Sequence, residues 1–492
     1  MSTFSQKLTL SNTPFFSEKK RGFQRLLFKD MKLFIALIIP ILLAVTPKEV
    51  IGLEALTVVQ YRVLIIFVFA ALSWMLEPIP AYATSIIVIV AQLILISDGG
   101  LSFLIDDIDK EALISSKSIF STFASPIILL FLGGFFMAIA ATKYGLDKQL
   151  AGFMLKPFGS KPSTVMLGLM LITALFSMFM SNTATTAMML AIVFPIVNTV
   201  NKKDPLRKAL LLCIPLAANI GGIGTPIGTP PNAIAMKYLA DITTISFGQW
   251  MMIGIPYVAV MLFLGWVLLR VLFKSETEEI KLALSESLKL TPQSIIVLVT
   301  FAGTVFLWMT KSLHGMNAYV VAVIPIALFL ALGIINKDDL KGISWDVLWL
   351  VSGGIALGLA LDKSGLANFA ISSLPLESVS ALTILIGLSF LGMVMANFMS
   401  NTAAANLMLP LIVVLAGTMT SISDVGGTLV VILSVTLSVS LGMSLPISTP
   451  PNALAFASGK LETKDLARVG VIVGIFGVFM VLLFMYVYHL FI

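Results

Sequence analysis

The sequence predicts an all-α integral membrane protein, and three observations support this prediction. Hydrophobic residues make up 58% of the 492 residues and charged residues only 11%, with a mean hydropathy of +1.03. Soluble proteins carry about 25% charged residues. Apolar stretches long enough to cross a bilayer recur along the whole chain. Two of the longest stretches are interrupted by the same polar triplet, once in each half, which indicates an internal repeat.

Eleven stretches are predicted to span the membrane, because a spanning helix needs about 20 mostly apolar residues. They lie at 32–46, 59–76, 80–97, 120–142, 208–237, 246–272, 293–310, 317–335, 345–363, 426–456 and 466–490. Two further stretches, 163–200 and 380–418, are each about twice as long as one hairpin arm. Each carries its triplet near its centre, which is typical of a re-entrant hairpin that enters and leaves on one side.

Basic residues gather in loops that alternating spans place on one side, which the positive-inside rule makes cytoplasmic. Residues 1–31 are therefore expected to form a basic cytoplasmic segment before the first transmembrane helix at 32–46, and 273–292 a cytoplasmic linker. The acidic loop 104–111 and the C-terminus then lie outside, in a multi-pass protein of the plasma membrane. The basic residues are Lys19, Lys20, Arg21, Arg25 and Lys29, then Lys148, Lys156 and Lys161, then Lys202, Lys203, Arg207 and Lys208, and finally Lys274, Lys281 and Lys289.

The repeat extends beyond the triplets. Ser181 and Ser400 are 219 residues apart, and the pairs Gly133-Gly134 and Gly353-Gly354 are 220 apart. Five spans lie between corresponding points, and because five is odd, the two halves must be inverted relative to each other. We therefore expect a first inverted repeat over 59–272 and a second over 293–492. Their hairpins at 163–200 and 380–418 should then meet tip to tip near the middle of the membrane.

The motifs favour binding of an anion together with a hard cation. The triplets Ser181-Asn182-Thr183 and Ser400-Asn401-Thr402 place hydroxyl and amide groups at helix N-termini, whose free N–H groups favour anions. Each triplet is followed by a Thr-Pro-Pro-Asn segment that must interrupt the helix around it, at 208–237 and at 426–456. Carbonyls released by such a break need a protein group, water or an ion as partner, and oxygen ligands suit Na⁺.

Several classes of function are excluded or disfavoured. The single cysteine, Cys213, excludes a disulfide framework and a cysteine metal site. No GxxxxGK[ST] loop is present, so a gradient is expected to supply the energy. Neither hairpin core nor either Pro-Pro break contains an ionisable residue, so no proton relay is visible there. No enzyme and no nucleic-acid partner is expected.

The alternative reading of each motif is purely structural. A lone serine or threonine in a membrane helix is usually a packing residue, and a proline is usually a kink. Two symmetric copies of both elements favour the functional reading. For Lys143, Asp362 and Lys363, which lie at the ends of spans, snorkelling or pairing with a loop is the preferred reading.

The paired triplets and Thr-Pro-Pro-Asn segments resemble those of the divalent anion/sodium symporter family of di- and tricarboxylate carriers. The resemblance covers nearly the whole chain after residue 30. It implies a homodimer in the lipid bilayer, in which each protomer holds a scaffold and a transport part that moves as an elevator. It also implies that substrate carboxylates lie between the tips. The residues implied to bind substrate are Ser181, Asn182, Thr183, Thr229, Pro230, Ser400, Asn401, Thr402, Thr449 and Pro450.

The resemblance further implies two sodium sites. The first would use Ser177, Ser181, Asn182 and a carbonyl at Gly228. The second would use Asn401 and a carbonyl at Ser448, together with a hydroxyl four residues before the triplet. That position is Ala396, followed by Asn397, so the second site departs from the family pattern.

The function expected from the sequence is secondary active transport of small dicarboxylates with four or five carbons, such as succinate, malate, fumarate or 2-oxoglutarate. Ala396 favours exchange of one dicarboxylate for another, with Na⁺-coupled symport as the alternative. A sulfate or other inorganic dianion carrier is a further alternative on the same architecture. A channel is disfavoured because each hairpin tip blocks one side. No covalent cofactor is expected, and Na⁺ is the candidate coupling ion.

Overall fold

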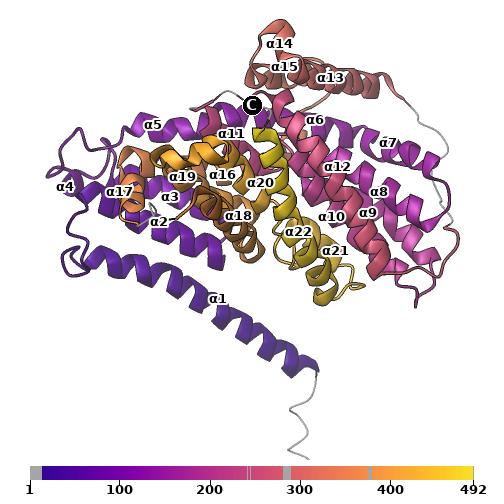
Figure 1. Ribbon diagram of the computed structural model, residues 1–492, viewed down its shortest axis with the longest axis horizontal. Helices are drawn as coiled ribbons and strands as arrows, with labels where there is room; N and C mark the ends of the chain where they lie inside the picture. The colour runs from indigo at the N-terminus through magenta and orange to yellow at the C-terminus, as the bar shows by residue number, and fades with distance from the viewer. Residues whose placement is uncertain (1–13, 241, 244, 281–289, 375–378, 491–492) are drawn as a thin grey trace, which may run out of the picture.

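The computed structural model describes residues 14–240, 242–243, 245–280, 290–374 and 379–490, and for 14–29 it describes the backbone alone. Within these ranges the chain is helical, without β-strands (Figure 1). The predicted all-α membrane fold is thereby confirmed. Most of the basic segment 1–31 and much of the linker 273–292 lie outside the described residues or side chains.

The first half of the chain folds into a series of helices joined by short turns. In order they are α1 (Pro14–Val45), α2 (Val58–Leu76), α3 (Ala81–Leu95), α4 (Ser102–Ile105), α5 (Ser116–Ser121), η2 (Thr122–Ala124), α6 (Pro126–Lys143), α7 (Leu146–Leu155), η3 (Lys156–Phe158), α8 (Pro162–Ser177), α9 (Asn182–Thr199), α10 (Leu206–Gly221), η4 (Gly222–Gly224), α11 (Pro230–Ala240) and α12 (Phe247–Leu272).

The second half repeats much of this order. Its helices are α13 (Pro292–Met309), α14 (Lys311–His314), α15 (Ala318–Ala331), η5 (Asp339–Gly342), α16 (Trp345–Lys363), α17 (Leu366–Ser372), α18 (Ala381–Phe398), α19 (Asn401–Thr418), η7 (Thr420–Val425), α20 (Gly427–Val439), α21 (Pro450–Phe456) and α22 (Thr463–His489).

Two predicted spans differ from the helices found. The first transmembrane helix is part of a longer helix that begins at Pro14, because hydropathy marks the membrane boundary while charged residues such as Glu, Lys and Arg continue a helix readily. The span 120–142 is divided at Ser125, where proline at the next position starts α6 and excludes the α conformation just before it.

The helices long and apolar enough to span a membrane are not the same set as the eleven predicted spans. In the described part of the chain, ten helices are long and apolar enough to cross a membrane by length and composition. Three of these, α9, α18 and α19, are arms of the predicted hairpins. Four predicted spans are not among the ten: α3, α15 and α20 have only 15, 14 and 13 residues, and the side chains of α1 are described only from residue 30 on. Seven of the ten therefore coincide with predicted spans.

Equivalent helices of the two halves make equivalent contacts across the molecule. α3 packs on α16 of the other half, and α15 packs on α6. A Cβ on Gly353 would lie 2.3 Å from the Cβ of Ser85, and one on Gly133 would lie 2.4 Å from the carbonyl oxygen of Ala322. After each of these glycine-bearing helices, a glycine with positive φ, Gly145 at +64° or Gly365 at +72°, turns the chain into α7 or α17. Glycine adopts this conformation without a steric penalty.

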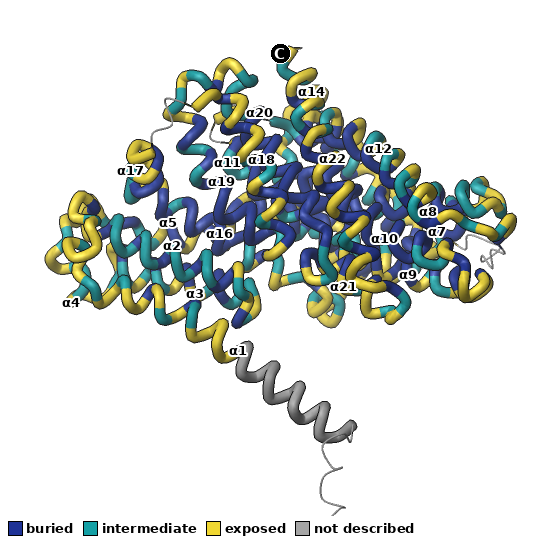
Figure 2. The backbone as a smooth tube through the Cα atoms, turned by 60° about the horizontal axis from the view of Figure 1, so that its bottom comes forward, coloured by how far each residue is buried: buried dark blue, intermediate teal, exposed yellow. Residues whose placement is uncertain are grey.

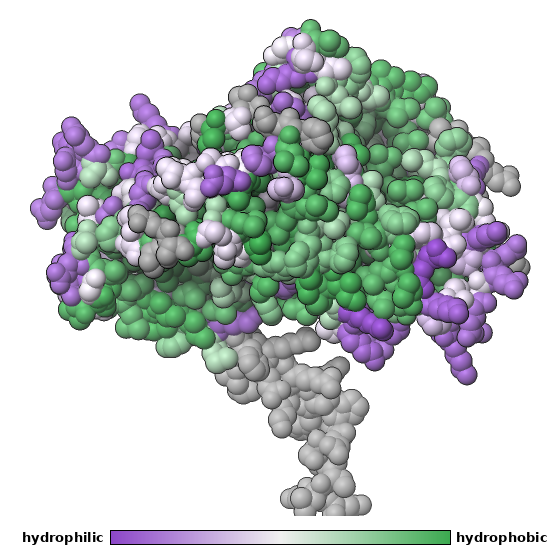
Figure 3. All heavy atoms as spheres, in the orientation of Figure 1, coloured by the Kyte–Doolittle hydropathy of each residue, from purple (hydrophilic) through white to green (hydrophobic). Residues whose placement is uncertain are grey.

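Burial and surface composition fit a bilayer protein. Figure 2 shows that the buried backbone runs through the middle of the molecule, where α10 and α16 are labelled. α20 is also buried over most of its length. Figure 3 shows apolar side chains over most of the visible face, while hydrophilic side chains gather near α4 and below α9 and α21. An outer surface dominated by apolar side chains, with polar ends, is typical of a chain in contact with lipid.

Candidate functional site

The first hairpin consists of α8 and α9, which meet at a four-residue tip. α8 ends at Ser177 and α9 begins at Asn182. Ser181 is the N-cap of α9, and its hydroxyl accepts a hydrogen bond of 3.2 Å from the backbone N–H of Ala184. Serine is among the preferred N-cap residues because it satisfies one of the free N–H groups of the first turn. The remaining N–H groups of that turn are available to an anion.

Below this tip, oxygen atoms from the hairpin and from the break after α10 come together. The Ser177 hydroxyl lies 2.6 Å from Asn182 Oδ1 and 2.8 Å from the carbonyl oxygen of Ala218. A Cβ on Gly222 would lie 2.7 Å from Asn182 Oδ1 and 3.0 Å from the carbonyl oxygen of Gly228. We call this group, made of Ser177, Asn182 and the carbonyls of Ala218 and Gly228, the first oxygen cluster. It contains only neutral oxygens, which are ligands that hard cations accept.

Backbone carbonyls at the two helix breaks accept hydrogen bonds from side chains of the protein itself. Asn232 donates from its amide nitrogen to the carbonyls of Gly222 at 3.0 Å and Thr225 at 2.8 Å. In the second half, Asn452 donates in the same way to Met443 at 2.7 Å and Leu445 at 3.0 Å. The asparagine of each Thr-Pro-Pro-Asn segment is therefore the partner of carbonyls that the interrupted helix releases.

The second hairpin repeats this arrangement with one difference. Ser400 is the N-cap of α19 and accepts from the N–H of Ala403 at 3.2 Å. Asn401 donates to the carbonyl of Ser440 at 3.4 Å, but its side-chain oxygen is buried without a hydrogen-bond partner. At the place of Ser177 stands Ala396, whose Cβ packs against Gly442. No hydroxyl is therefore available at that position to donate to Asn401.

Asn397 does not supply the missing group. Its side-chain oxygen accepts from the backbone N–H of Ser444 at 2.7 Å, and its nitrogen donates to the carbonyl of Met393 at 2.9 Å. The hydroxyl of Ser448 in turn donates to the carbonyl of Asn397 at 2.8 Å. Asn397 and Ser448 thus fasten the second break to the second hairpin.

One polar contact joins the two halves at the centre. Asn219, buried in α10 of the first half, donates to the Thr449 hydroxyl at 3.1 Å and to the side-chain oxygen of Asn452 at 3.3 Å. α21 of the second half packs on α9 and α10, while α11 of the first half packs on α19 and α20. Each break therefore lies against the hairpin of the other half.

The remaining residues of the predicted substrate site differ in how far they are exposed. Thr229 and Thr402 are buried, at 4% and 8% exposure. Pro230 is half-buried as the first residue of α11, while Thr183 and Pro450 are exposed. Among the described residues, no group of three or more His, Cys, Asp or Glu could hold a metal ion. Any cation at these motifs would have to be bound by neutral oxygens.

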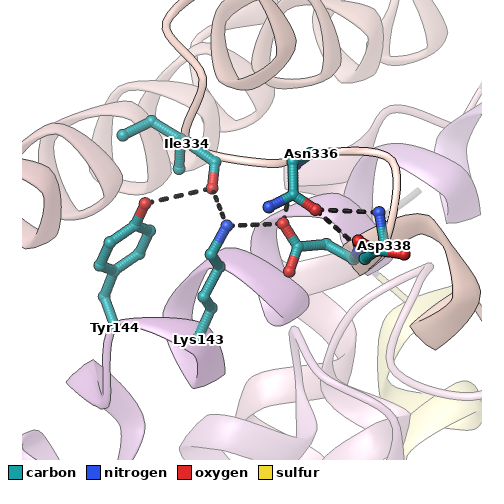
Figure 4. A network of polar contacts seen from close by, with 6 residues as sticks. Lys143, Tyr144, Ile334, Asn336 and Asp338 are labelled. Carbon is teal, nitrogen blue, oxygen red and sulfur yellow. Dashed lines mark hydrogen bonds and ion pairs between the residues drawn. The ribbon is translucent and has the colours of Figure 1, made fainter.

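A cavity of about 490 Å³ reaches the tip of the first hairpin at Ser181 and Ala184. Its wall includes Lys143 at the end of α6, whose ammonium group lies 2.6 Å from Asp339 and donates to the carbonyl of Ile334 at 2.9 Å (Figure 4). Asp339 also accepts from the N–H of Asn336. The hydrogen bond from Lys143 lowers the pKa of Asp339 against the opposing effect of burial. The pairing of Lys143 with a loop is as the sequence suggested.

The two hairpins differ in how closely they pack against the glycine-bearing helix of their own half, α6 or α16. α19 packs along α16, where Asn406 is fully buried and donates to the carbonyl of Leu350 at 3.1 Å. Gly354 leaves room for it, because a Cβ there would overlap the Asn406 oxygen. In the described part of the chain, the equivalent pair α9 and α6 has no comparable packing, and Ala187, the counterpart of Asn406, is exposed.

Sequence reasoning missed Asn219 and Asn406. Each is an asparagine flanked on both sides by apolar residues of a long apolar stretch, and a polar residue at membrane depth is itself a signal of an interhelical contact. That signal was available in the sequence and identifies both positions.

Three comparisons place the chain among known proteins. The family model described as "Sodium:sulfate symporter transmembrane region" matches residues 28–492. A sodium-dependent dicarboxylate transporter of Staphylococcus saprophyticus is 32% identical over 86% of this chain and 85% of its own length, and its counterpart in Staphylococcus aureus is 30% identical over the same shares. An uncharacterized transporter of Schizosaccharomyces pombe is 33% identical over 72% of this chain and 41% of its own length. The crystal structure of the Alcanivorax borkumensis YdaH transporter is similar in fold, with a TM-score of 0.54, 11% identity and coverage of 76% of this chain and 86% of that one.

Proposed function

The chain belongs to the sodium:sulfate symporter family, a family of membrane transporters and not of enzymes, and from that premise we propose that it carries small dicarboxylates across the membrane together with Na⁺. The two staphylococcal relatives, which match over most of their length, are named as sodium-dependent dicarboxylate transporters. Dianions with four or five carbons, such as succinate, malate, fumarate and 2-oxoglutarate, are the proposed substrates.

The observation that carries this proposal is the first oxygen cluster directly beneath a helix N-terminus. Ser177, Asn182 and the Gly228 carbonyl offer oxygens to a cation, and the first turn of α9 offers N–H groups to a carboxylate. Because neither hairpin contains a lysine or arginine, a co-bound cation would offset much of the anion's charge. Binding of substrate and Na⁺ would then be mutually dependent, which is the basis of symport.

The proposed substrate site lies between the two tips, at Ser181, Asn182, Thr183, Ser400, Asn401 and Thr402, with Thr229, Pro230, Thr449 and Pro450 beside them. Support comes from the contact of each break with the opposite hairpin and from the Asn219–Thr449 hydrogen bond. Thr183 and Pro450 are exposed, so a substrate can reach both of them.

We propose that the halves are inverted repeats and that transport proceeds by an elevator movement in a homodimer of the plasma membrane, with a cytoplasmic N-terminus and an external C-terminus. The reciprocal packing of α3 on α16 and of α15 on α6 supports the repeat. The moving part would contain both hairpins and both broken helices. The cavity at Ser181 and the close packing of α19 on α16 correspond to a state open on the first-hairpin side.

A second candidate function is exchange of one dicarboxylate for another, which Ala396 favours. The second sodium site lacks the hydroxyl that Ser177 provides to the first, and the Asn397 oxygen is already engaged by Ser444. A weakened second site would reduce the sodium contribution to uphill transport. The names of the relatives support symport, which is therefore our first choice.

The test is uptake of labelled succinate and 2-oxoglutarate into proteoliposomes, with external sodium and internal substrate varied independently. We expect concentrative uptake into empty vesicles that requires sodium. Uptake that needs internal substrate but no sodium would establish exchange instead. If sulfate is transported and dicarboxylates neither enter nor compete, the chain is an inorganic-anion carrier and the proposal is wrong.

A further inference from the structure

A second cavity, of about 700 Å³, lies on the second-hairpin side of the molecule, and charged and hydroxyl-bearing side chains form part of its wall. Lys237 and Tyr238 at the end of α11 line one wall, and Asp362 and Lys363 at the end of α16 line another. The hydroxyl-bearing segment formed by α5 and η2, including Ser121, closes it from a third direction. The function proposed above does not use this cavity.

The cavity lies directly beyond the contact that closes the second hairpin. α16 contributes Leu350 and Gly354 to the contact with Asn406, and about two turns later it contributes Asp362 and Lys363 to the cavity. α19 likewise lines the cavity at Pro410, about one turn after Asn406 and nine residues, or roughly 13 Å, after the tip. The cavity is therefore the last space that a solute from this side reaches before the closed contact.

α11 connects the cavity to the centre by a second route. It begins at Pro230, in the first Thr-Pro-Pro-Asn segment, and ends at the cavity with Lys237 and Tyr238. Lys237 is half-buried, with its ammonium group 5.6 Å from the ring centre of Tyr238, so its charge is held at the cavity wall. One helix thus joins the proposed binding region to a lysine at the mouth.

The two mouths of the molecule are lined by different charged groups. Among the described residues, those that line the second-hairpin cavity are Lys237, Lys363 and Asp362. Those that line the first-hairpin cavity are Lys143, Asp338 and Asp339, and both of these carboxylates are ion-paired, Asp339 with Lys143 and Asp338 with Lys341. An anion therefore meets two ammonium groups and one carboxylate at the mouth beside the second hairpin, and one ammonium group and two carboxylates at the other.

We propose that the cavity beside the second hairpin is a capture site for small dicarboxylate dianions, in which Lys237 and Lys363 hold the carboxylates before the substrate passes to the tips. This inference rests on the proposed function and adds a second, weaker site to it. Two ammonium groups in a partly enclosed recess raise the local concentration of an anion and its rate of association. Hydroxyls of α5 and η2 add neutral donors that fit a carboxylate.

The test measures the KM for succinate from each side of the membrane in oriented vesicles, at low and high ionic strength. We expect Lys237→Gln/Lys363→Gln to raise the KM by about three- to tenfold from the second-hairpin side only, with little change in maximal rate. The increase should shrink at high salt, because screening weakens an electrostatic effect but does not repair a misfolded protein. Asp362→Asn should lower the same KM, a gain that damage to the fold does not produce.

The matched control is Lys117→Gln, which removes an exposed lysine from the same face, on α5, without altering the cavity wall. It should leave the KM unchanged. Equal shifts from both sides, or no shift in a protein that transports succinate, would overturn the capture site alone. A wild-type protein that carries no dicarboxylate would overturn the proposed function and this assignment together.

Discussion

A single hydroxyl distinguishes the two hairpins. Ser177 donates to Asn182 in the first hairpin, whereas Ala396 leaves the Asn401 oxygen buried without a partner in the second. An unpaired buried acceptor costs about 1–3 kcal/mol, which a bound cation would recover. The second half therefore keeps an oxygen suited to Na⁺ while lacking one of the groups that would hold the ion.

This difference predicts opposite effects of two substitutions on sodium dependence. Ser177→Ala should raise the sodium concentration for half-maximal succinate uptake by up to about tenfold, because a loss of 1.4 kcal/mol in binding is tenfold in affinity. Ala396→Ser should lower that concentration, since it restores the oxygen in the second half. Unchanged sodium dependence in both variants would show that these positions do not contact the ion.

Two close helix crossings hold the halves together. α16 crosses α3 where Gly353 faces Ser85, and α6 crosses α15 where Gly133 faces Ala322. Small residues at such crossings let the backbones approach, which is how helices associate in a bilayer where both surroundings are apolar. The α16 crossing also places Leu350, whose carbonyl accepts from both Ser85 and Asn406.

Gly353→Ala should separate α16 from α3, because the new Cβ would lie 2.3 Å from the Cβ of Ser85. We expect a loss of about 1–3 kcal/mol of stability, typical of overpacking, and a lower melting temperature in detergent. The control is Gly303→Ala in α13, which meets no atom within 4 Å and should leave the melting temperature unchanged or slightly higher. Similar melting of the two variants would show that the crossing tolerates a side chain.

The elements could be predicted from sequence more completely than the contacts between them. The membrane class, the hairpin stretches around Ser181 and Ser400, and the start of new helices at Pro230 and Pro450 follow from composition and from proline chemistry. The burial of Asn406 and the exposure of Thr183 do not, because they depend on which face of a uniformly apolar helix meets a neighbour. Periodicity cannot indicate that face when both surroundings are apolar.

The whole molecule shows the same contacts twice. α3 with α16 corresponds to α15 with α6, and α21 with α9 corresponds to α11 with α19. The carbonyl-binding roles of Asn232 and Asn452 repeat as well. The proposed inverted repeat would account for these pairs, and it requires the loops after the two hairpins to lie on opposite sides of the membrane.

Cysteine labelling tests this arrangement. Lys202→Cys should react with a membrane-impermeant maleimide only from the cytoplasmic side, and Asp424→Cys only from outside, because both positions are exposed and follow opposite hairpins. The native Cys213 is fully buried, so the unmodified protein serves as a low-background control. Labelling of both positions from the same side would rule out the inverted arrangement and a shared central site.

The unequal packing of the two hairpins has a consequence for the resting state of the transporter. If the halves share one fold in opposite orientations, the conformation open to the other side is the same architecture with the roles of the hairpins exchanged. Were the two halves identical in sequence, both conformations would have equal energy. The preference for one of them must therefore be encoded where the halves differ, as at Asn406, buried against α16, and Ala187, exposed opposite α6. Exchanging these two residues would then favour the substrate-free conformation that is open on the second-hairpin side.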